Sequence, residues 1–262
     1  MKLIFTTCLL CLYSLFSFSQ NFVANEIEGR RLYQSEMASW YGTDVFLALK
    51  TDRSNVGGYV SYATGSGGTC VFFSKAEQPR IVASILFDST YNVKTAVTKL
   101  EERDLTEQET GLYKMRKAVL KLIEKDTLFK FYKNMSFNLI PIVSEGEKKV
   151  YVLTGPQENG VVVFGNDYLV NFDDKDNITK KKQLHKNIIV MDANVKDSTG
   201  KQIVTMHTHL PETGDFFTAT DICTLMLYGK FTTWSTHFVR SKNYVSFWNI
   251  KEEKSEMVKN EK

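Results

Sequence analysis

The spacing of hydrophobic and polar positions changes several times along the chain, and each change predicts a different kind of element. Up to residue 87, short runs of β-branched and aromatic residues alternate with turns that contain glycine or proline. This pattern is typical of antiparallel strands joined by short turns. We therefore expect a β-meander, with strands at residues 45–49, 59–62, 70–73 and 81–87.

Apolar residues with helical spacing follow at 93–100 and again at 112–122. Just before the second stretch, Thr106 and Glu109 have the spacing of a capping box, in which the threonine side chain accepts a bond from a backbone N–H and the glutamate reaches back. The two stretches therefore predict two helices, and the apolar stripe of the second is expected to pack in the core.

Strand-like runs return in the second half of the chain. A helix is expected at 219–228, ended by Gly229 in the left-handed conformation common at helix C-termini, and the charged tail from Lys251 is expected to fray. Together the elements predict an α+β fold, with a domain boundary near residues 132–136. The second-half strands are expected at 137–143, 150–154, 161–164, 168–172, 188–191, 203–209, 236–240 and 244–250.

The N-terminus has the pattern of a cleavable secretory signal peptide. Lys2 precedes an apolar run from Leu3 to Phe18, and small residues lie near a cleavage position between Ser19 and Gln20. A membrane anchor is the alternative, but the run is shorter than the ~20 residues that a spanning helix needs. We therefore expect an exported protein, periplasmic or extracellular, with no membrane span after cleavage.

Composition limits the classes of partner. The chain has 262 residues, 43% of them hydrophobic, which suffices for one large or two small domains. The formal net charge of +3 includes Lys2, so the mature chain is close to neutral and nucleic acid is not an expected partner. Cleavage leaves two cysteines, Cys70 and Cys223, and whether they pair in an oxidising compartment stays open.

Two histidines mark the strongest candidate for chemistry. His207 and His209 are two apart on a predicted strand, so their side chains point to the same face. Two neutral imidazoles on one face can bind a divalent metal, and Asp221, in the first turn of the next predicted helix, can supply a third ligand. His185 and His237 are either additional ligands or ordinary core or surface histidines.

The order His-x-His, a proline-containing loop and Thr-x-x-Asp resembles the JAMM (JAB1/MPN) family of metalloproteases. The resemblance covers about residues 137–250 and implies a zinc ion held by His207, His209 and Asp221, a water in the fourth position, and Thr218 in place of the family's catalytic serine. It further implies hydrolysis of peptide or isopeptide bonds, with a protein or peptide as substrate. Segments 149–155 and 164–168 also resemble exported bacterial proteins of uncharacterised function, which implies no activity.

The chain departs from the JAMM pattern in two ways. The loop between the second histidine and Thr218 has eight residues, 210–217, where the family usually has seven. No glutamate has the family's spacing for a general base, and the candidates are Glu36, Glu147, Glu158 and Glu212. The alternative to a hydrolase is therefore a non-catalytic exported binding protein on a degenerate JAMM-like scaffold.

These observations predict the following division of the chain. Residues 1–19 form the signal peptide, 20–135 a β-meander with helices, 136–250 a JAMM-like domain with a mixed sheet, and 251–262 a charged tail.

Overall fold

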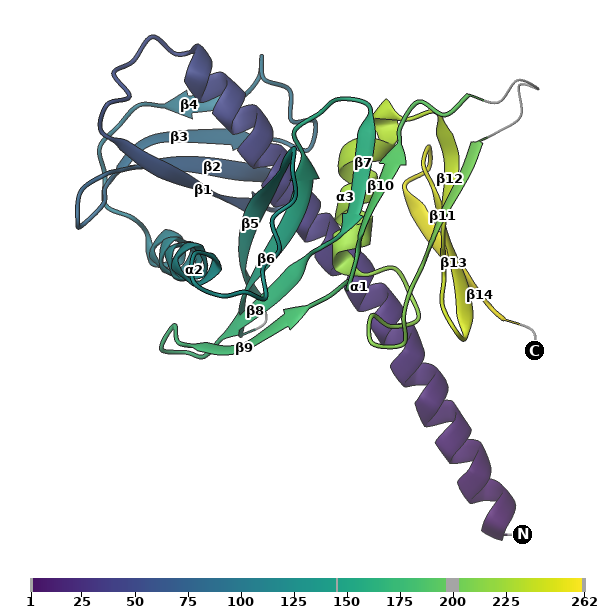
Figure 1. Ribbon diagram of the computed structural model, residues 1–262. Helices are drawn as coiled ribbons and strands as arrows, with labels where there is room; N and C mark the ends of the chain where they lie inside the picture. Colours follow the sequence, from purple (N-terminus) through teal and green to yellow (C-terminus); the bar gives the residue numbers. More distant parts are fainter. Residues whose placement is uncertain (1, 145, 197–202, 261–262) are drawn as a thin grey trace. The chain divides into compact units, whose positions relative to one another are not determined.

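The computed structural model describes residues 2–144, 146–196 and 203–260, with side chains from residue 21 onward (Figure 1). Over these ranges, three α-helices and several sheets give an α+β fold, as the sequence predicts. The chain divides into two compact units, unit 1 with residues 1–30 and 195–262 and unit 2 with residues 31–194. Helix α1 (Lys2–Ala48) contributes to both units.

Unit 2 contains the predicted meander and a second antiparallel sheet. The meander has the strand order β1-β2-β3-β4, the second sheet the order β5-β6-β8-β9, and β10 pairs with β7. All these pairings are antiparallel. The strands are β1 (Val56–Thr64), β2 (Gly67–Ser74), β3 (Ile81–Phe87), β4 (Val97–Lys99), β5 (Met135–Ser144), β6 (Glu147–Pro156), β7 (Val161–Gly165), β8 (Tyr168–Phe172), β9 (Ile178–Gln183) and β10 (Ile188–Asp192).

Helix α2 (Glu107–Ile123) joins the sheets of unit 2 in one apolar cluster. Its capping box is present as predicted: Glu109 N donates to Thr106 Oγ1 at 3.2 Å, and Thr106 N donates to Glu109 Oε2 at 2.8 Å. The predicted stripe packs against β1, β5, β6 and β8, with Leu112, Met115 and Val119 at most 1% exposed. Because this cluster includes residues on both sides of positions 132–136, unit 2 continues through the boundary suggested by the sequence.

Unit 1 contains the C-terminal sheet and one short helix. The strand order is β11-β12-β13-β14, with β11 parallel to β12 and the other pairs antiparallel, so this sheet is mixed. The predicted mixed-sheet domain of residues 136–250 does not form one unit, because its strands before residue 195 belong to unit 2 and pair in antiparallel fashion. The first part of α1 packs in this unit: an added Cβ on Gly29 would lie 2.7 Å from Ile222 Cβ, so glycine permits the close approach. The elements are β11 (Ile203–Thr208), α3 (Ala219–Tyr228), the 3₁₀ turn η1 (Gly229–Phe231), β12 (Trp234–Arg240), β13 (Tyr244–Asn249) and β14 (Lys254–Lys259).

Two sequence predictions in the N-terminal half are wrong. Residues 45–49 are not a strand, because α1 continues to Ala48 and the ring of Phe46 stacks on that of Phe72 at 4.0 Å. The buried face of α1 includes Ser35, Glu36, Ser39 and Gly42, so it lacks the apolar stripe that marks an amphipathic helix. The stretch 93–100 is not a helix: its apolar residues are largely exposed, and it supplies the short strand β4.

Two predictions near the C-terminus are also wrong. Gly229 has φ −52° and ψ −41°, so α3 passes into η1 instead of ending in a left-handed cap. The charged tail forms β14, which pairs with β13 along its whole length. Its charged side chains lie on the exposed positions of an edge strand, while Ser255 and Met257 are half-buried. A charged composition is therefore compatible with pairing at an edge.

Two further sequence expectations concern membranes and cysteines. Among the residues whose side chains the structure describes, no helix has both the length and the apolar character that crossing a bilayer requires. Cys70 and Cys223 are both buried and are thiols rather than the two halves of a disulfide. Burial raises the pKa of the Cys70 thiol well above its usual range, which opposes formation of the reactive thiolate.

Candidate metal centre

Strand β11 places both predicted histidines in the interior of unit 1. The burial of its side chains alternates, so Val204, Met206 and Thr208 are exposed whereas His207 and His209 are only 4% and 6% exposed. Pairing with β12 continues past the end of β11, because His209 N donates to Arg240 O at 2.9 Å. The strand period therefore directs the two imidazoles to one buried face, as the sequence predicts.

Helix α3 places Asp221 beside these histidines. Thr218 is the N-cap, and Asp221, three residues on, completes a capping box. The Asp221 Oδ2 atom accepts from Thr218 N at 2.8 Å and from Thr218 Oγ1 at 2.7 Å. The carboxylate is 1% exposed, and the partial positive charge of the helix N-terminus stabilises it there.

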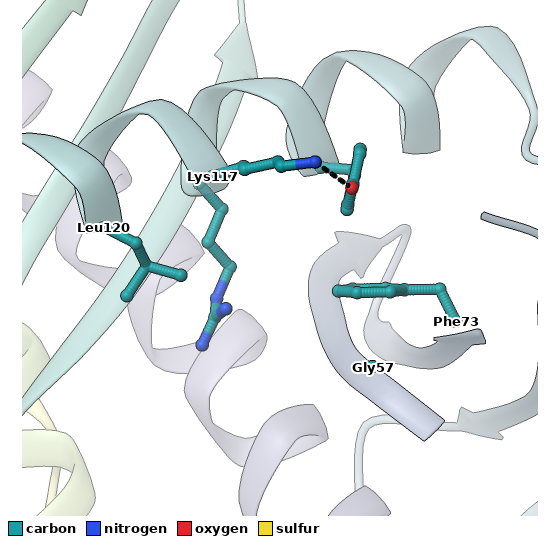
Figure 2. A pocket seen from close by; sticks show the side chains of 6 residues that line it. Gly57, Phe73, Lys117 and Leu120 are labelled. Carbon is teal, nitrogen blue, oxygen red and sulfur yellow. Dashed lines mark hydrogen bonds between the residues drawn. The ribbon is translucent and has the colours of Figure 1, made fainter. Parts of the chain in front are cut away.

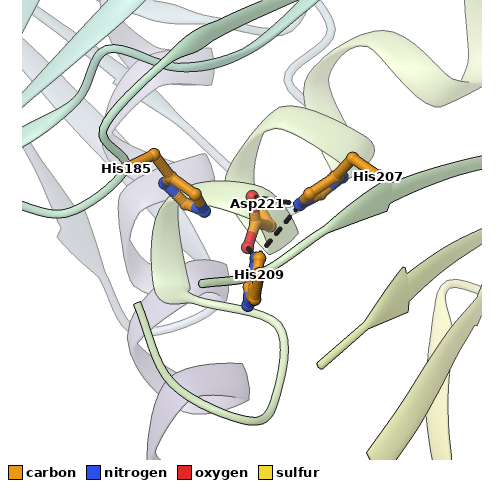
Figure 3. A group of neighbouring side chains, drawn as sticks. All are labelled: His185, His207, His209 and Asp221. Atoms are coloured by element: carbon orange, nitrogen blue, oxygen red, sulfur yellow. Dashed lines mark hydrogen bonds and ion pairs between the residues drawn. The ribbon is translucent and has the colours of Figure 1, made fainter. Parts of the chain in front are cut away.

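The three side chains form a compact group of ligand atoms (Figure 3). The Nε2 atoms of His207 and His209 are 3.1 Å apart. Asp221 Oδ2 lies 3.2 Å from His209 Nε2, and Asp221 Oδ1 lies 3.5 Å from His207 Nε2. Ligands bound tetrahedrally at ~2.0–2.1 Å are about 3.3–3.4 Å from one another, and each of these distances is close to that spacing. His207, His209 and Asp221 therefore lie close enough together to bind a metal ion.

The charges of the group also suit a divalent cation. Two imidazoles and a carboxylate, all buried, carry one negative charge when the histidines are neutral. Neutral imidazoles bind metal through a bare ring nitrogen, and a buried carboxylate needs a cation or several hydrogen bonds. A divalent ion bound to these three side chains would supply the cation that the carboxylate needs.

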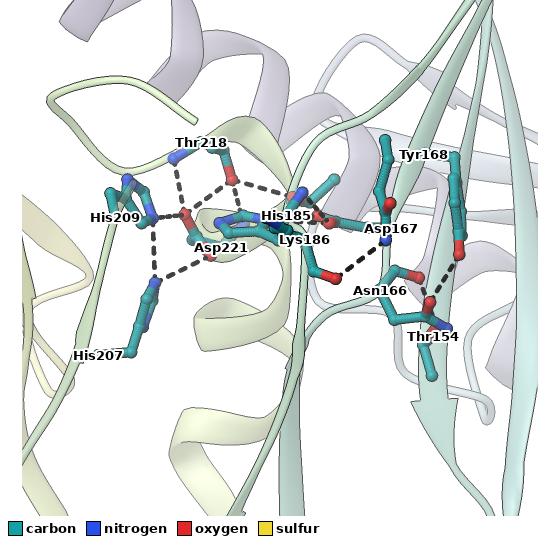
Figure 4. Close-up of polar contacts among 12 residues, drawn as sticks. Thr154, Asn166, Asp167, Tyr168, His185, Lys186, His207, His209, Thr218 and Asp221 are labelled. Carbon is teal, nitrogen blue, oxygen red and sulfur yellow. Dashed lines mark hydrogen bonds and ion pairs between the residues drawn. The ribbon is translucent and has the colours of Figure 1, made fainter. Parts of the chain in front are cut away.

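Thr218, which the JAMM resemblance puts in the serine position, caps helix α3. Its Oγ1 atom accepts from Asp221 N at 3.1 Å and lies 2.9 Å from Thr220 Oγ1 (Figure 4). With the bond that it donates to Asp221, the hydroxyl has three polar neighbours. The eight-residue loop before it, 210–217, brings the cap into place. Its end is fixed by two buried rings, with Phe216 packed on Tyr244 at 4.9 Å and Phe217 6.3 Å from His237.

His237 lies behind His207 and contacts it directly. Its Nε2 atom is 2.9 Å from His207 Nδ1, and its Nδ1 atom is 2.7 Å from Thr205 Oγ1. Burial, together with the nearby His207, lowers the pKa of His237 to about 3, so this imidazole is neutral. Because Thr205 and His207 occupy its two nitrogens, His237 is a partner of a predicted ligand instead of an additional ligand. Nothing in the sequence marks this role.

His185 belongs to unit 2 and is held by a carboxylate. Its Nδ1 atom lies 2.8 and 3.0 Å from the two oxygens of Asp167, and its backbone N–H donates to the same side chain (Figure 4). The carboxylate favours the proton on Nδ1 and leaves Nε2 bare, as in many metal-binding histidines. The role of His185 as an additional ligand stays a prediction, which the zinc affinity of a His185→Ala variant tests.

The four candidate glutamates occupy different surroundings. Glu147 is exposed and pairs with Lys149, and Glu158 is exposed and bonds Asn134. Glu212 is exposed in the loop before α3. Glu36 is 3% exposed, and burial raises its pKa to about 7, although Arg116 opposes the shift. The assignment of a general base among them stays open.

A cavity of about 160 Å³ lies in unit 2, at helix α2 (Figure 2). Lys117 Nζ donates to Tyr113 Oη there at 2.9 Å and lies 5.2 Å from the same ring. The cavity is lined by Gly57, Phe73, Tyr113, Arg116, Lys117 and Leu120. These six residues include two cations and no carboxylate, histidine or cysteine, so the lining lacks the side chains that most often bind metal cations.

Comparison with known proteins gives no relative. No protein-family model, no curated protein and no solved structure matches this chain. The resemblance to the JAMM family therefore stays a prediction based on the motif.

Proposed function

We propose that the protein is an exported zinc-dependent hydrolase of peptide or isopeptide bonds, with His207, His209 and Asp221 as the zinc ligands. The observation that carries the proposal is the buried group of two imidazoles and a carboxylate. The two Nε2 atoms are 3.1 Å apart, and the two oxygens of Asp221 lie 3.2 Å from Nε2 of His209 and 3.5 Å from Nε2 of His207. Three protein ligands and an open position are typical of catalytic zinc sites, whereas structural zinc sites have four protein ligands.

A zinc ion bound by three protein ligands supplies Lewis-acid chemistry, lowering the pKa of a coordinated water to about 7 and polarising a carbonyl group. The chain's own residues orient this chemistry. The backbone N–H and hydroxyl of Thr218 hold Oδ2 of Asp221, and His237 holds Nδ1 of His207. Burial of all three ligands excludes bulk water from their charges.

Export is part of the proposal and rests on the N-terminal sequence. Cleavage after Ser19 would leave a chain that begins at Gln20. Two contacts of α1 in unit 1 lie beyond this point: the ring of Phe22 meets that of Phe216 at 5.6 Å, and Asn25 Nδ2 donates to Phe217 O at 2.8 Å. The mature protein would therefore keep these contacts, and the mass of the secreted chain gives its first residue.

A second candidate is a metal-binding protein without catalysis, as expected for a degenerate JAMM-like scaffold. One observation favours it: the Thr218 hydroxyl donates to Asp221 Oδ2 and accepts from the backbone N–H of Asp221. The hydroxyl therefore acts as both donor and acceptor within the helix cap. A hydroxyl engaged in this way would have to break a bond before it could stabilise a reacting oxygen.

Metal analysis of the mature protein, followed by a peptidase screen, tests the proposal. We expect about one zinc per chain in the wild type, and none in a His207→Ala/His209→Ala double variant or in Asp221→Asn. The matched control is Asp215→Asn, which changes a carboxylate in the loop before α3 that bonds Ser241 and Asn243. This control should keep its zinc.

The peptidase screen measures cleavage of fluorogenic peptide and isopeptide substrates. Zinc-dependent cleavage that Asp221→Asn abolishes and Asp215→Asn retains would support the hydrolase. Zinc binding without cleavage of any substrate would favour the non-catalytic protein, and a wild type that takes up no zinc when zinc is offered would overturn both.

A further inference from the structure

The histidine behind the ligand triangle occupies a position set by the register of two parallel strands. Thr205 on β11 pairs with His237 on β12, and His207 pairs with Val239. The His237 side chain can therefore reach both Thr205 and His207, and it bridges Thr205 Oγ1 at 2.7 Å and His207 Nδ1 at 2.9 Å. His237 is 0% exposed and His207 is 4% exposed, so the bond between the two imidazoles is buried, while Thr205 is partly exposed.

The protons in this chain can be arranged in only two ways when both imidazoles are neutral. A neutral imidazole has one N–H and one bare nitrogen. In the first arrangement, His207 donates from Nδ1 to His237 Nε2, and His237 donates from Nδ1 to Thr205. In the second, Thr205 donates to His237, and His237 donates to His207. Only the first leaves Nε2 of His207 bare, and this is the atom that faces His209 and Asp221.

We propose that His237, assisted by Thr205, is a positioning residue of the metal centre. It accepts a hydrogen bond from the Nδ1–H of His207 and so keeps the Nε2 atom of His207 unprotonated and available to the metal. This inference rests on the zinc site proposed above. Partners of this kind orient metal-binding histidines and increase their basicity in many proteins, where a carboxylate or a carbonyl usually fills the role. Here the imidazole of His237 fills this role, and the hydroxyl of Thr205 accepts a hydrogen bond from Nδ1–H of His237.

The surroundings of His237 hold its ring in one orientation. The indole of Trp234 stacks on it at a centroid distance of 5.5 Å and an interplanar angle of 20°. The ring of Phe217 lies 6.3 Å away on the segment that leads into α3. An imidazole that stacks on an indole ring in a closely packed interior has little room to turn and present its nitrogens elsewhere.

Variants of His237 separate its hydrogen bond from its packing. His237→Phe keeps an aromatic ring beside Trp234 but removes the acceptor, and we expect it to weaken zinc binding by about 10- to 100-fold. His237→Gln retains an amide oxygen near the position of Nε2, so it should recover most of the affinity. Thr205→Val, which keeps the shape and removes the hydroxyl, should weaken binding less than His237→Phe, and Thr205→Ser should restore it.

Nitrogen NMR provides a readout that packing alone would not change. Long-range ¹H–¹⁵N spectra of the zinc-loaded wild type should show His207 and His237 both protonated on Nδ1. The affinities are measured by competition with a chromophoric zinc chelator on folded, full-length mature protein. Thr205→Val provides this test even if His237→Phe does not fold.

The outcomes distinguish the two proposals. If the wild type binds no zinc, the metal centre itself is refuted and the role of His237 falls with it. If the wild type binds zinc through His207 but His237→Phe and Thr205→Val bind it equally well, the site stands and the positioning role is refuted. A proton on Nε2 of His237 in the zinc-loaded protein would refute the role as well.

Discussion

The two compact units bury different kinds of residue. Unit 2 is organised around a cluster of apolar side chains from α2 and both of its four-stranded sheets. Unit 1 buries three of the chain's four histidines and Asp221 beside its apolar residues. An apolar cluster is stabilised by removal from water, whereas buried imidazoles need hydrogen-bond partners and a buried carboxylate needs a cation or hydrogen bonds. The apolar cluster accounts for the folding of unit 2, whereas the buried imidazoles and carboxylate of unit 1 are typical of a metal site.

Zinc removal should distinguish the units most strongly. At zinc concentrations about 1,000 times Kd, bound metal stabilises a folded site by about 4 kcal/mol. We expect the His207→Ala variant to lose this zinc-dependent gain, because one of the three ligands is absent. Thermal unfolding with and without zinc measures the effect, and an equal zinc-dependent gain in variant and wild type would contradict it.

A core substitution in unit 2 should have the opposite character. Leu112→Ala removes a side chain that is 1% exposed in the centre of the apolar cluster. We expect it to lower the free energy of unfolding by about 3 kcal/mol, from lost burial and the cavity left behind. Urea unfolding gives the change, and the zinc content should stay at the wild-type level. Loss of zinc in this variant would show that zinc binding in unit 1 depends on the packing of the apolar core of unit 2.

One buried acid in unit 2 departs from the apolar pattern and makes stability depend on pH. Burial raises the pKa of Glu36 from 4.5 to about 7. Below pH 4.5 the folded and unfolded states are both protonated. Between pH 4.5 and 7 the unfolded state loses its proton first, so this carboxyl lowers the stability of the fold as pH rises, and the effect stays constant above pH 7.

The Glu36→Gln variant removes this dependence. Relative to wild type, it should gain stability between pH 4.5 and 7, by up to about 3 kcal/mol at the upper end. Urea unfolding of both proteins at pH 4, 5.5 and 8 measures the difference. A difference that does not change with pH would mean that Glu36 has the same pKa in the folded and unfolded states, which would contradict the raised pKa.

The smallest effect is expected at the N-terminus of α2. Thr106→Ala removes the hydroxyl that accepts from Glu109 N, and a lost cap costs about 1 kcal/mol. Thr106→Ser keeps the acceptor and should be close to wild type in urea unfolding. Equal destabilisation by both variants would assign the effect to packing of the threonine methyl group.

Local patterns in the sequence predicted the parts of the fold that local physics decides. The capping box at Thr106, the stripe of α2 and helix α3 follow from side chains within a few residues of one another. The alternation that brings His207 and His209 to one face is equally local. Asp221 was predictable because it lies in the first turn after a cap.

The missed features depend on residues distant in sequence. The second half of α1 buries Ser35, Glu36 and Gly42, and an added Cβ on Gly42 would lie 2.5 Å from Cys70 Cβ, so its packing partner is a strand that the helix's own sequence does not reveal. The contact between His237 and His207 depends on the parallel register of β11 and β12. Such pairings follow from the fold and not from spacing along the chain.

X-ray absorption at the zinc edge of the mature protein tests the central claim most directly, because it reports the atoms around the metal. The account predicts about one zinc per chain, with nitrogen and oxygen ligands at about 2.0–2.1 Å and the outer scattering of two or more imidazoles. Loss of bound zinc in Asp221→Asn would confirm the carboxylate ligand. Zinc surrounded by sulfur at about 2.3 Å, or no zinc after it is offered, would contradict the account.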